Sequence, residues 1–472
     1  MYSEKMAAQS HQHRGHTYWQ WIFGIIASMG FMVYGLEAAW ISPTTKKLQS
    51  PDSPLGFPLS NNAISWIGSI SCFVSALFVI PFSYSADRFG RKWVTFAIII
   101  PKTLSIILRL FVPNLIALLI ARALAGIAAS GIFVVIPIYV RELSQSNLIG
   151  ALGSLNVVMQ NIGFLIMYLI GAYFDYYTVL WIYLAFPILM AILLVMAPDS
   201  PAYLVKKGRI DEAYAAVAFL RGLKIDDKVV KTEIEFMQRQ EEEFENLPKI
   251  GLKEIYQNKA WRRGFILMIL IWTAQTWNGS FAIMTYASAI LDSTGSNMSI
   301  SSELQTVSFP IVMIIASFTL TAIAERCGRK PLHAGSYLLS TISHTGLGVA
   351  MLVQRFGYSI PGWLPIMCMI VAVATYAGGV RPLPYIICIE IFNFQVRAKV
   401  TGLIHTFGWT SVSTQLFAFA PLVDTFGLHT TFLLFGLINL LGVVIAMFIP
   451  ETRGKSEMEV MEKLYNKNKL ST

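Results

Sequence analysis

The stretch Asp87-Arg88-Phe89-Gly90-Arg91-Lys92 decides the fold, because it returns later in the chain as Glu325-Arg326-Cys327-Gly328-Arg329-Lys330. The second copy begins 238 residues (325 − 87) after the first, which is close to half of the 472 residues. Each copy stands between two long apolar stretches and keeps both the glycine and a leading acid. Two ordinary basic loops would explain the charges but not these matches. The repeat therefore predicts a membrane protein built from two parallel halves.

The composition supports a membrane protein. The chain is 55% hydrophobic and only 13% charged, with a mean hydropathy of +0.58, whereas a soluble protein carries about a quarter charged residues. Apolar runs of about 20 residues recur, each long enough to cross a hydrocarbon core of about 30 Å. The net charge of +9 is dispersed over short loops, which argues against a nucleic-acid partner.

The apolar runs predict an all-α membrane protein with twelve transmembrane helices in two pseudo-symmetric six-helix halves. We expect the spans at residues 19–42, 62–86, 93–113, 115–140, 150–173, 177–197, 262–291, 303–324, 331–353, 363–389, 399–422 and 427–449. The expected organisation is a cytoplasmic tail at 1–18, a first half at 19–197, linker helices at 198–261, a second half at 262–449 and a second tail at 450–472. Within the linker, Ile210, Ala213, Tyr214, Val217 and Leu220 share one helical face.

The distribution of basic residues predicts the orientation in the membrane. If the N-terminus is cytoplasmic, the inner loops and tails hold nearly all the lysines and arginines, and the outer loops hold only Lys46, Lys47 and Arg355. The positive-inside rule then places both termini in the cytoplasm. The first eighteen residues contain no apolar core, so no cleaved signal peptide is expected. Asn297 begins a sequon in a predicted outer loop, where glycosylation is possible.

The sequence contains no pattern typical of an enzyme or of a metal protein. There is no Walker loop and no nucleophile constellation, and the four cysteines have no metal or disulfide spacing. His11, His13 and His16 in the first tail could bind a metal, but a solvated tail is our interpretation. We therefore expect no enzyme activity, no catalytic residue, no cofactor and no metal site.

Several motifs follow one another in a fixed order. The first half contains Arg88-Phe89-Gly90-Arg91-Lys92, Pro137-Ile138-Tyr139-Val140-Arg141-Glu142 and Pro198-Asp199-Ser200-Pro201. The second contains Pro382-Leu383-Pro384, Glu390-Ile391-Phe392 and Pro450-Glu451-Thr452-Arg453-Gly454. Together they resemble the sugar porter family of the major facilitator superfamily, and look most similar to the insect trehalose and hexose facilitators. The resemblance implies a plasma-membrane carrier that moves a sugar through the lipid bilayer by alternating access and needs no oligomer.

The resemblance also implies a cytoplasmic gate of acid and base pairs. Its residues would be Arg91, Lys92, Glu142, Glu325, Arg329, Lys330, Glu390 and Arg397. Such pairs would bridge the two halves in the outward-facing state and break when the carrier opens inward. Ile149 stands where the family usually has arginine, so we expect a weaker gate.

By the same resemblance, the substrate would meet Gln160, Gln275, Asn278, Arg381, Tyr385 and Trp409. Much of the hexose pattern is absent from the matching positions, which hold Val157, Thr276, Phe281, Met313 and Gly408. Arg381 replaces a small glycine before Pro382 and leaves three interpretations open: binding of an anionic or strongly hydroxylated substrate, pairing with Glu37, or snorkelling.

Three further charges lie at membrane depth, where an unpaired charge is costly. Glu37 occupies the slot where proton-coupled sugar porters carry aspartate, and Arg122 keeps a family arginine. The two could couple transport to protons, or form a structural ion pair. Lys102 has no counterpart in the family, and our interpretation is snorkelling.

The leading hypothesis is a facilitative carrier of trehalose or a hexose. The alternatives are a proton-coupled symporter that uses Glu37 and Arg122, a sugar sensor, or a carrier of a solute other than a sugar. The sensor hypothesis is motivated by the eroded pocket and by Ile149, but the second tail is short for a signalling role.

Overall fold

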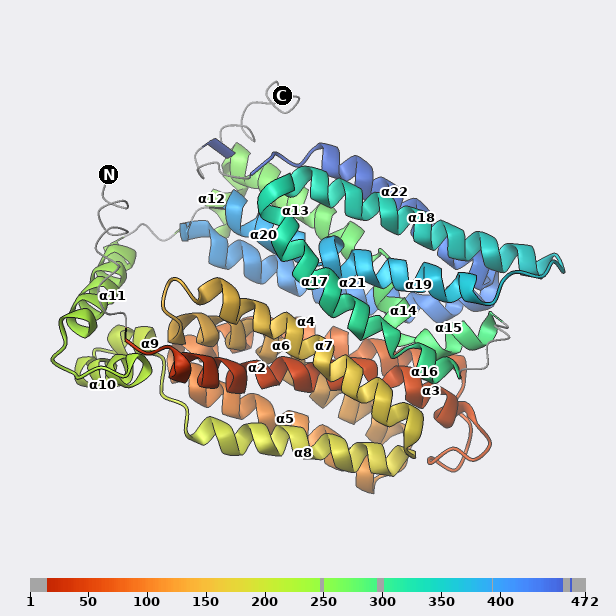
Figure 1. The fold of residues 1–472 in the computed structure, drawn as a ribbon, viewed down its shortest axis with the longest axis horizontal. Helices are drawn as coiled ribbons and strands as arrows, with labels where there is room; N and C mark the ends of the chain where they lie inside the picture. The colour runs from red at the N-terminus through yellow and green to blue at the C-terminus, as the bar shows by residue number, and fades with distance from the viewer. Residues whose placement is uncertain (1–14, 247–249, 295–300, 393, 453–458, 461–472) are drawn as a thin grey trace.

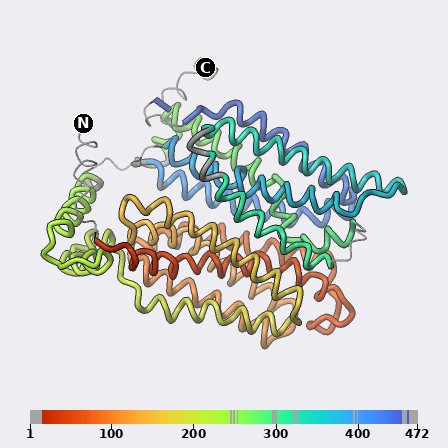
Figure 2. Tube along the Cα trace, in the orientation of Figure 1, coloured from red at the N-terminus to blue at the C-terminus, as the bar shows by residue number. Residues whose placement is uncertain are grey.

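The computed structural model describes residues 15–246, 250–294, 301–392, 394–452 and 459–460. The secondary structure within these ranges is helical, and none of them contains a strand. Figure 1 shows two bundles of long helices lying side by side, one formed by the first half of the chain and the other by the second half. The colours of Figure 2 separate into the same two bodies, so the predicted all-α architecture is confirmed.

The first bundle contains six long helices and one short one. They are α2 (Tyr18–Ala39), α3 (Ile41–Gln49), α4 (Asn61–Phe89), α5 (Arg91–Phe111), α6 (Leu115–Leu143), α7 (Ile149–Tyr173) and α8 (Tyr176–Val195).

In the second bundle several spans are interrupted. The helices are α13 (Lys259–Thr276), α14 (Ser280–Thr285), α15 (Ala287–Ser293), α16 (Ser302–Gln305), α17 (Ser308–Cys327), α18 (Arg329–Arg355), α19 (Trp363–Thr375), η2 (Tyr376–Val380), α20 (Pro382–Ile391), α21 (Phe394–Phe426) and α22 (Leu428–Met447).

Eleven of the helical stretches in the described ranges are long and apolar enough to cross a membrane. α21 occupies the remaining place among the twelve expected spans and has 33 residues. Buried polar side chains such as Ser411, Ser413 and Gln415 make it less apolar than the other spans.

Four helices connect the two bundles at one end of the molecule, which we call the linker end (Figure 1). They are α9 (Pro201–Lys206), α10 (Ile210–Arg221), α11 (Lys228–Asn246) and α12 (Leu252–Gln257). Ala213, Val217 and Leu220 are buried on one face of α10, as its amphipathic pattern predicts. The opposite end of the bundles, which contains α3, α15 and α16, is called the far end.

The repeated basic stretch forms the same tight turn in both bundles. Gly90 separates α4 from α5 with a φ of 91°, and Gly328 separates α17 from α18 with a φ of 84°. A Cβ atom at Gly90 would lie 2.8 Å from a ring carbon of Tyr203, and one at Gly328 would lie 2.7 Å from a carboxylate oxygen of Glu451. The left-handed backbone and the close neighbour both require glycine, which explains why this residue is repeated.

Within the first bundle, α2 and α7 cross with their backbones in contact. A Cβ atom at Gly163 would lie 2.1 Å from the carbonyl oxygen of Met32, and one at Gly35 would lie 2.1 Å from that of Gln160. Small residues of this kind let membrane helices approach closely. The crossing fixes the position of Gln160 at the middle of the bundle.

Candidate functional site

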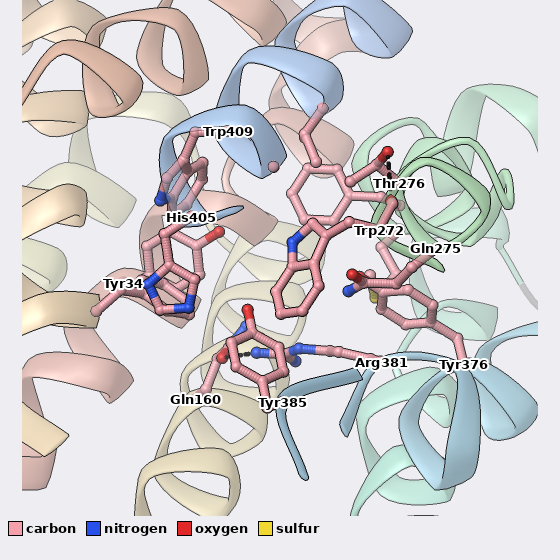
Figure 3. Close-up of a pocket in the computed structure, with 15 residues that line it drawn as sticks. Tyr34, Gln160, Trp272, Gln275, Thr276, Tyr376, Arg381, Tyr385, His405 and Trp409 are labelled. Carbon is pink, nitrogen blue, oxygen red and sulfur yellow. Dashed lines mark hydrogen bonds between the residues drawn. The ribbon is translucent and has the colours of Figure 1, made fainter. Parts of the chain in front are cut away.

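A cavity of about 620 Å³, including the part open to solvent, lies between the two bundles. Both bundles contribute to its wall (Figure 3). The lining residues are Tyr34, Phe133, Gln160, Trp272, Gln275, Thr276, Phe281, Met284, Tyr376, Arg381, Tyr385, His405, Gly408, Trp409 and Val412. We call this space the central cavity.

Arg381 reaches the central cavity because its span is interrupted. The backbone N–H of Arg381 donates to the carbonyl oxygen of Tyr376 at 2.9 Å, which is the five-residue spacing of the π-helix η2. Pro382 follows directly and has no N–H to continue a regular helix. Such π-turns are common at functional sites. The Arg381 side chain donates to Gln160 Oε1 across the cavity, as Figure 3 shows.

Of the three interpretations of Arg381, the structure contradicts two. Arg381 points into the central cavity and contacts Gln160 in the middle of α7, so it does not snorkel to a membrane surface. The carboxylate of Glu37 pairs instead with Lys102, Arg109 and Arg122. Among the described residues, Arg381 forms no ion pair with a carboxylate. Binding of an anionic or strongly hydroxylated substrate stays a prediction.

Aromatic rings surround the cavity in two groups. In the second bundle, the ring of Trp272 lies 4.8 Å from that of Tyr385 and 6.0 Å from that of His405. Between the bundles, Phe133 packs edge-on against both Tyr34 and Trp409. Rings with polar atoms at their edges give a ligand an apolar face together with hydrogen-bonding groups.

Four of these aromatic residues, Tyr34, Phe133, Trp272 and His405, were missed in the sequence, and a signal was present for the last two. His405 lies four residues before Trp409 and Trp272 lies three residues before Gln275, so each shares a helix face with a residue that was predicted to line the pocket. The Trp272 ring packs directly against Gly408, where a Cβ atom would lie only 2.5 Å from Trp272 Nε1. The absence of a side chain at position 408 thus leaves room for the indole ring beside the cavity.

The structure brings together five of the six residues that were predicted to meet the substrate. They are Gln160, Gln275, Arg381, Tyr385 and Trp409.

Asn278 was also predicted to meet the substrate, but its side chain does not line the central cavity. Its side chain is fully buried away from the cavity, where it donates to Ser340 Oγ at 2.8 Å and to the side-chain oxygen of Asn439. The reason is local: α13 ends at Thr276, and Gly279, with a φ of 96°, turns the chain so that Asn278 packs against α18 and α22.

A buried ionic cluster lies in the first bundle beside the cavity. Glu37 accepts from Lys102 Nζ at 2.5 Å, from Arg109 at 2.5 Å, from Arg122, and from the Tyr183 hydroxyl at 2.9 Å. The charged side chains are at most 5% exposed. Three bases therefore share one carboxylate, and Arg109 Nε and Nη1 have no hydrogen-bond partner.

The cluster corrects our interpretation of Lys102, which was expected to snorkel. The ammonium group is instead fully buried and paired with Glu37, because α5 packs against the rest of the bundle with its basic face inward. Arg109 was missed altogether. The signal was present, since Lys102 and Arg109 lie seven residues apart and so share one face of a helix.

The predicted gate residues form matching sets at the linker end of each bundle. Arg91 pairs with Glu142 at 2.9 Å in the first bundle, and Arg329 pairs with Glu390 at 2.9 Å in the second. Each acid also accepts a hydroxyl hydrogen bond, Glu142 from Ser200 and Glu390 from Thr452.

The other gate residues also bind within their own bundle. Lys92 donates to the carbonyl oxygen of Val195, Lys330 to that of Met447, and Arg397 to that of Phe392. The Glu325 side chain lies outside the described residues, as does Asn297.

The two bundles contact each other at the far end through polar groups. Ser288 Oγ donates to the carbonyl oxygen of Ser42 at 2.6 Å, and Tyr168 donates to that of Met284 at 2.6 Å. Lys46 lies 3.3 Å from carboxylate oxygens of both Asp292 and Glu303. Nearer the middle, Ser413 Oγ donates to the Ser69 carbonyl oxygen at 3.1 Å. These contacts hold the bundles together between the central cavity and the far end.

The described residues contain no group of three or more histidine, cysteine, aspartate or glutamate side chains placed to hold a metal ion. His11 and His13 lie outside the described residues.

Two six-helix bundles around a polar and aromatic cavity at membrane depth define the architecture of a membrane transporter. The model of the sugar (and other) transporter family matches residues 14–464. The chain belongs to this family.

Several relatives share the family. The facilitated trehalose transporter Tret1 of Aedes aegypti is 28% identical over 449 residues, which cover 94% of this chain and 55% of the relative. Tret1 of Polypedilum vanderplanki is 28% identical over 459 residues, which cover 95% of this chain and 88% of the relative. The chain thus spans about half the length of the first relative and most of the second.

Solved structures show the fold. The inward-open conformation of the xylose transporter XylE from E. coli matches with a TM-score of 0.77 and 19% identity, over 94% of this chain and 99% of that chain. The proton:xylose symporter XylE bound to 6-bromo-6-deoxy-D-glucose matches with a TM-score of 0.73 and 20% identity, over 94% and 99% of the two chains. The protein therefore has the major facilitator fold with twelve spans, as the apolar runs and the family resemblance predicted.

Proposed function

We propose that this protein is a facilitative carrier, and not an enzyme, which moves a sugar such as trehalose or a hexose across the plasma membrane. The observation that carries the proposal is the central cavity, whose wall combines Gln160 of one bundle with Gln275 and Trp272 of the other. A ligand held by both bundles can be passed from one side to the other when they rock about it. The names of the insect relatives support a sugar as the substrate.

The linker end would face the cytoplasm. The two repeated basic stretches, with Arg91 and Arg329, lie there, and the positive-inside rule assigns such basic loops to the inner face. The contacts of Ser42, Lys46 and Tyr168 with the second bundle would then close the extracellular side, so the structure would correspond to an inward-facing state. In this state Glu142 and Glu390 pair within their own bundles, and they would exchange partners across the interface when the linker end closes.

The buried ionic cluster favours facilitated transport over proton symport. A coupling carboxylate must gain and lose a proton during the cycle, whereas Glu37 is enclosed by Lys102, Arg109 and Arg122. Protonation of Glu37 would leave three buried bases without a counter-charge, which is strongly unfavourable. We therefore expect Glu37 to stay ionised throughout the transport cycle and to serve as the structural counter-charge of the three bases.

Uptake into proteoliposomes tests both the substrate and the mode. We expect labelled trehalose or a hexose to equilibrate across the membrane, and an inward proton gradient to leave the final internal concentration unchanged. Valinomycin with equal potassium on both sides holds the membrane potential at zero, and liposomes without protein provide the control. Accumulation above the external concentration would reject the facilitative mode, and the absence of any uptake of a folded protein would reject the carrier itself.

A disulfide across the far end should arrest transport. In a variant whose four native cysteines (Cys72, Cys327, Cys368 and Cys388) are serine, the pair Ser42→Cys and Ser288→Cys should cross-link on oxidation, because the two hydroxyl oxygens lie 3.4 Å apart. The bond would hold the extracellular side closed. We expect uptake to be lost and to return after reduction, while each single-cysteine variant keeps its uptake under the same oxidant. Undiminished uptake by a fully cross-linked protein would contradict alternating access.

A further inference from the structure

We infer that the preferred substrate is an acidic sugar, a polyhydroxylated molecule with one carboxylate, and that Arg381 is the residue which selects it. The inference rests on the proposed function and adds the charge of the substrate to it. Trehalose and the simple hexoses would then be neutral molecules for which the cavity is incompletely matched.

The first observation is that Arg381 is an uncompensated charge in the cavity. Its guanidinium donates to the neutral amide of Gln160, and it has no carboxylate partner among the described residues. A charge at membrane depth is normally paired or hydrated. Arginine offers five N–H donors in a planar fork that matches a carboxylate, and one contact to Gln160 leaves most of them for a ligand.

The second observation concerns the charges around the cavity. A smaller cavity, which shares Tyr34, Phe281 and Trp409 with the central one, is lined by Glu37 and Arg122. Glu37 also binds Lys102 and Arg109. Two bases and one acid, Arg381, Arg122 and Glu37, therefore line the two spaces, and two more bases lie behind Glu37. This excess of positive charge in a region of low dielectric attracts anions into the cavity.

The rest of the wall indicates that the anion carries hydroxyl groups as well. Gln275, Tyr385 and Gln160 offer neutral hydrogen-bonding groups near Arg381 (Figure 3). Trp272 and Tyr385 add ring faces on the same side. A purely apolar carboxylate would leave these amide and hydroxyl groups without partners, which is unfavourable in a closed site. A sugar acid satisfies both the base and the neutral groups.

The test compares labelled D-glucuronate, D-glucose, trehalose and acetate in proteoliposomes of the full chain at zero membrane potential. We expect wild-type protein to take up glucuronate about tenfold faster than the neutral sugars. Arg381→Gln should lower glucuronate uptake about tenfold and change glucose uptake little, because it removes the charge alone. Arg381→Lys should keep part of the glucuronate uptake, since the charge remains but the fork is lost. Arg239→Gln, at an exposed linker position, is the matched control and should resemble wild type.

Each other outcome overturns a definite statement. Uptake of neutral sugars without preference for glucuronate, or an equal loss of charged and neutral substrates in Arg381→Gln, would overturn the acidic-sugar inference and leave the proposed carrier intact. Uptake of acetate as fast as glucuronate would overturn the requirement for a sugar. Thermal unfolding of each variant shows whether it is folded, and if Arg381→Gln is not, the Arg381→Lys ratio of glucuronate to glucose decides. Absence of all uptake by folded wild-type protein would overturn the proposed function itself.

Discussion

Replacement of Glu37 by glutamine is expected to destabilise the protein more than any other single change of charge. The substitution leaves Lys102, Arg109 and Arg122 close together in a buried site with no counter-charge. Removing one partner from a single buried ion pair costs about 3–5 kcal/mol, and here one acid serves three bases. We expect a strong loss of folded protein and a lower Tm of whatever can be purified in detergent.

The comparison that isolates this effect uses two further variants. Glu303→Gln removes an acid from an ion pair with the exposed Lys46 at the far end, and should change the Tm little because surface pairs contribute about 0–1 kcal/mol. Lys102→Met in the Glu37→Gln background removes one excess charge and should recover part of the lost stability. If Glu37→Gln is as stable as wild type and loses only accumulation of substrate against a gradient, Glu37 is a coupling residue and the structural role is wrong.

Replacement of Gly163 by leucine is expected to separate α2 from α7 and to abolish correct folding of the first bundle. Even a single Cβ atom at this position would lie 2.1 Å from the carbonyl oxygen of Met32, and backbone atoms cannot move aside as a side chain can. Overpacking a well-packed core with side-chain atoms already costs about 1–3 kcal/mol. The yield of monodisperse protein on size exclusion and the Tm in detergent would measure the loss.

The same helix provides the matched control. Gly153 also lies in α7, but a Cβ atom there would meet nothing within 4 Å. Gly153→Leu should therefore keep the yield and the Tm near those of wild type, although both substitutions add the same side chain. Equal behaviour of the two variants would mean that the close approach of α2 and α7 is not needed for stability.

Much of the fold could be predicted because its causes are local or repeated. A run of apolar residues long enough to cross the membrane forms a helix wherever it stands, since the bilayer leaves no other partner for its backbone. The glycine of each basic stretch is required by its own turn, at Gly90 and again at Gly328. Residues on helix faces near motifs, such as Gln160 and Gln275, were predicted for the cavity and line it.

The site predictions that failed have a common cause: the direction in which a side chain points depends on how neighbouring helices pack. The Asn278 side chain does not line the cavity because a positive φ at Gly279 turns the chain away just after α13 ends. The prediction that Lys102 snorkels was wrong. A base on an isolated helix can reach the membrane surface, whereas α5 meets Glu37 of α2 only after the bundle has formed. Arg109 was missed for the same reason.

The sequence by itself determined the two halves, the twelve spans and the glycine turns of the repeated basic stretch, because each depends on hydropathy or on backbone conformation within a few residues. Only the tertiary structure decided which charges are paired. It enclosed Glu37 among three bases of α5 and α6, kept the gate pairs within their own bundles, and left Arg381 facing the cavity. The physical reason is that the energy of a charge in a membrane depends on the groups within a few ångströms of it, and those groups come from distant parts of the chain.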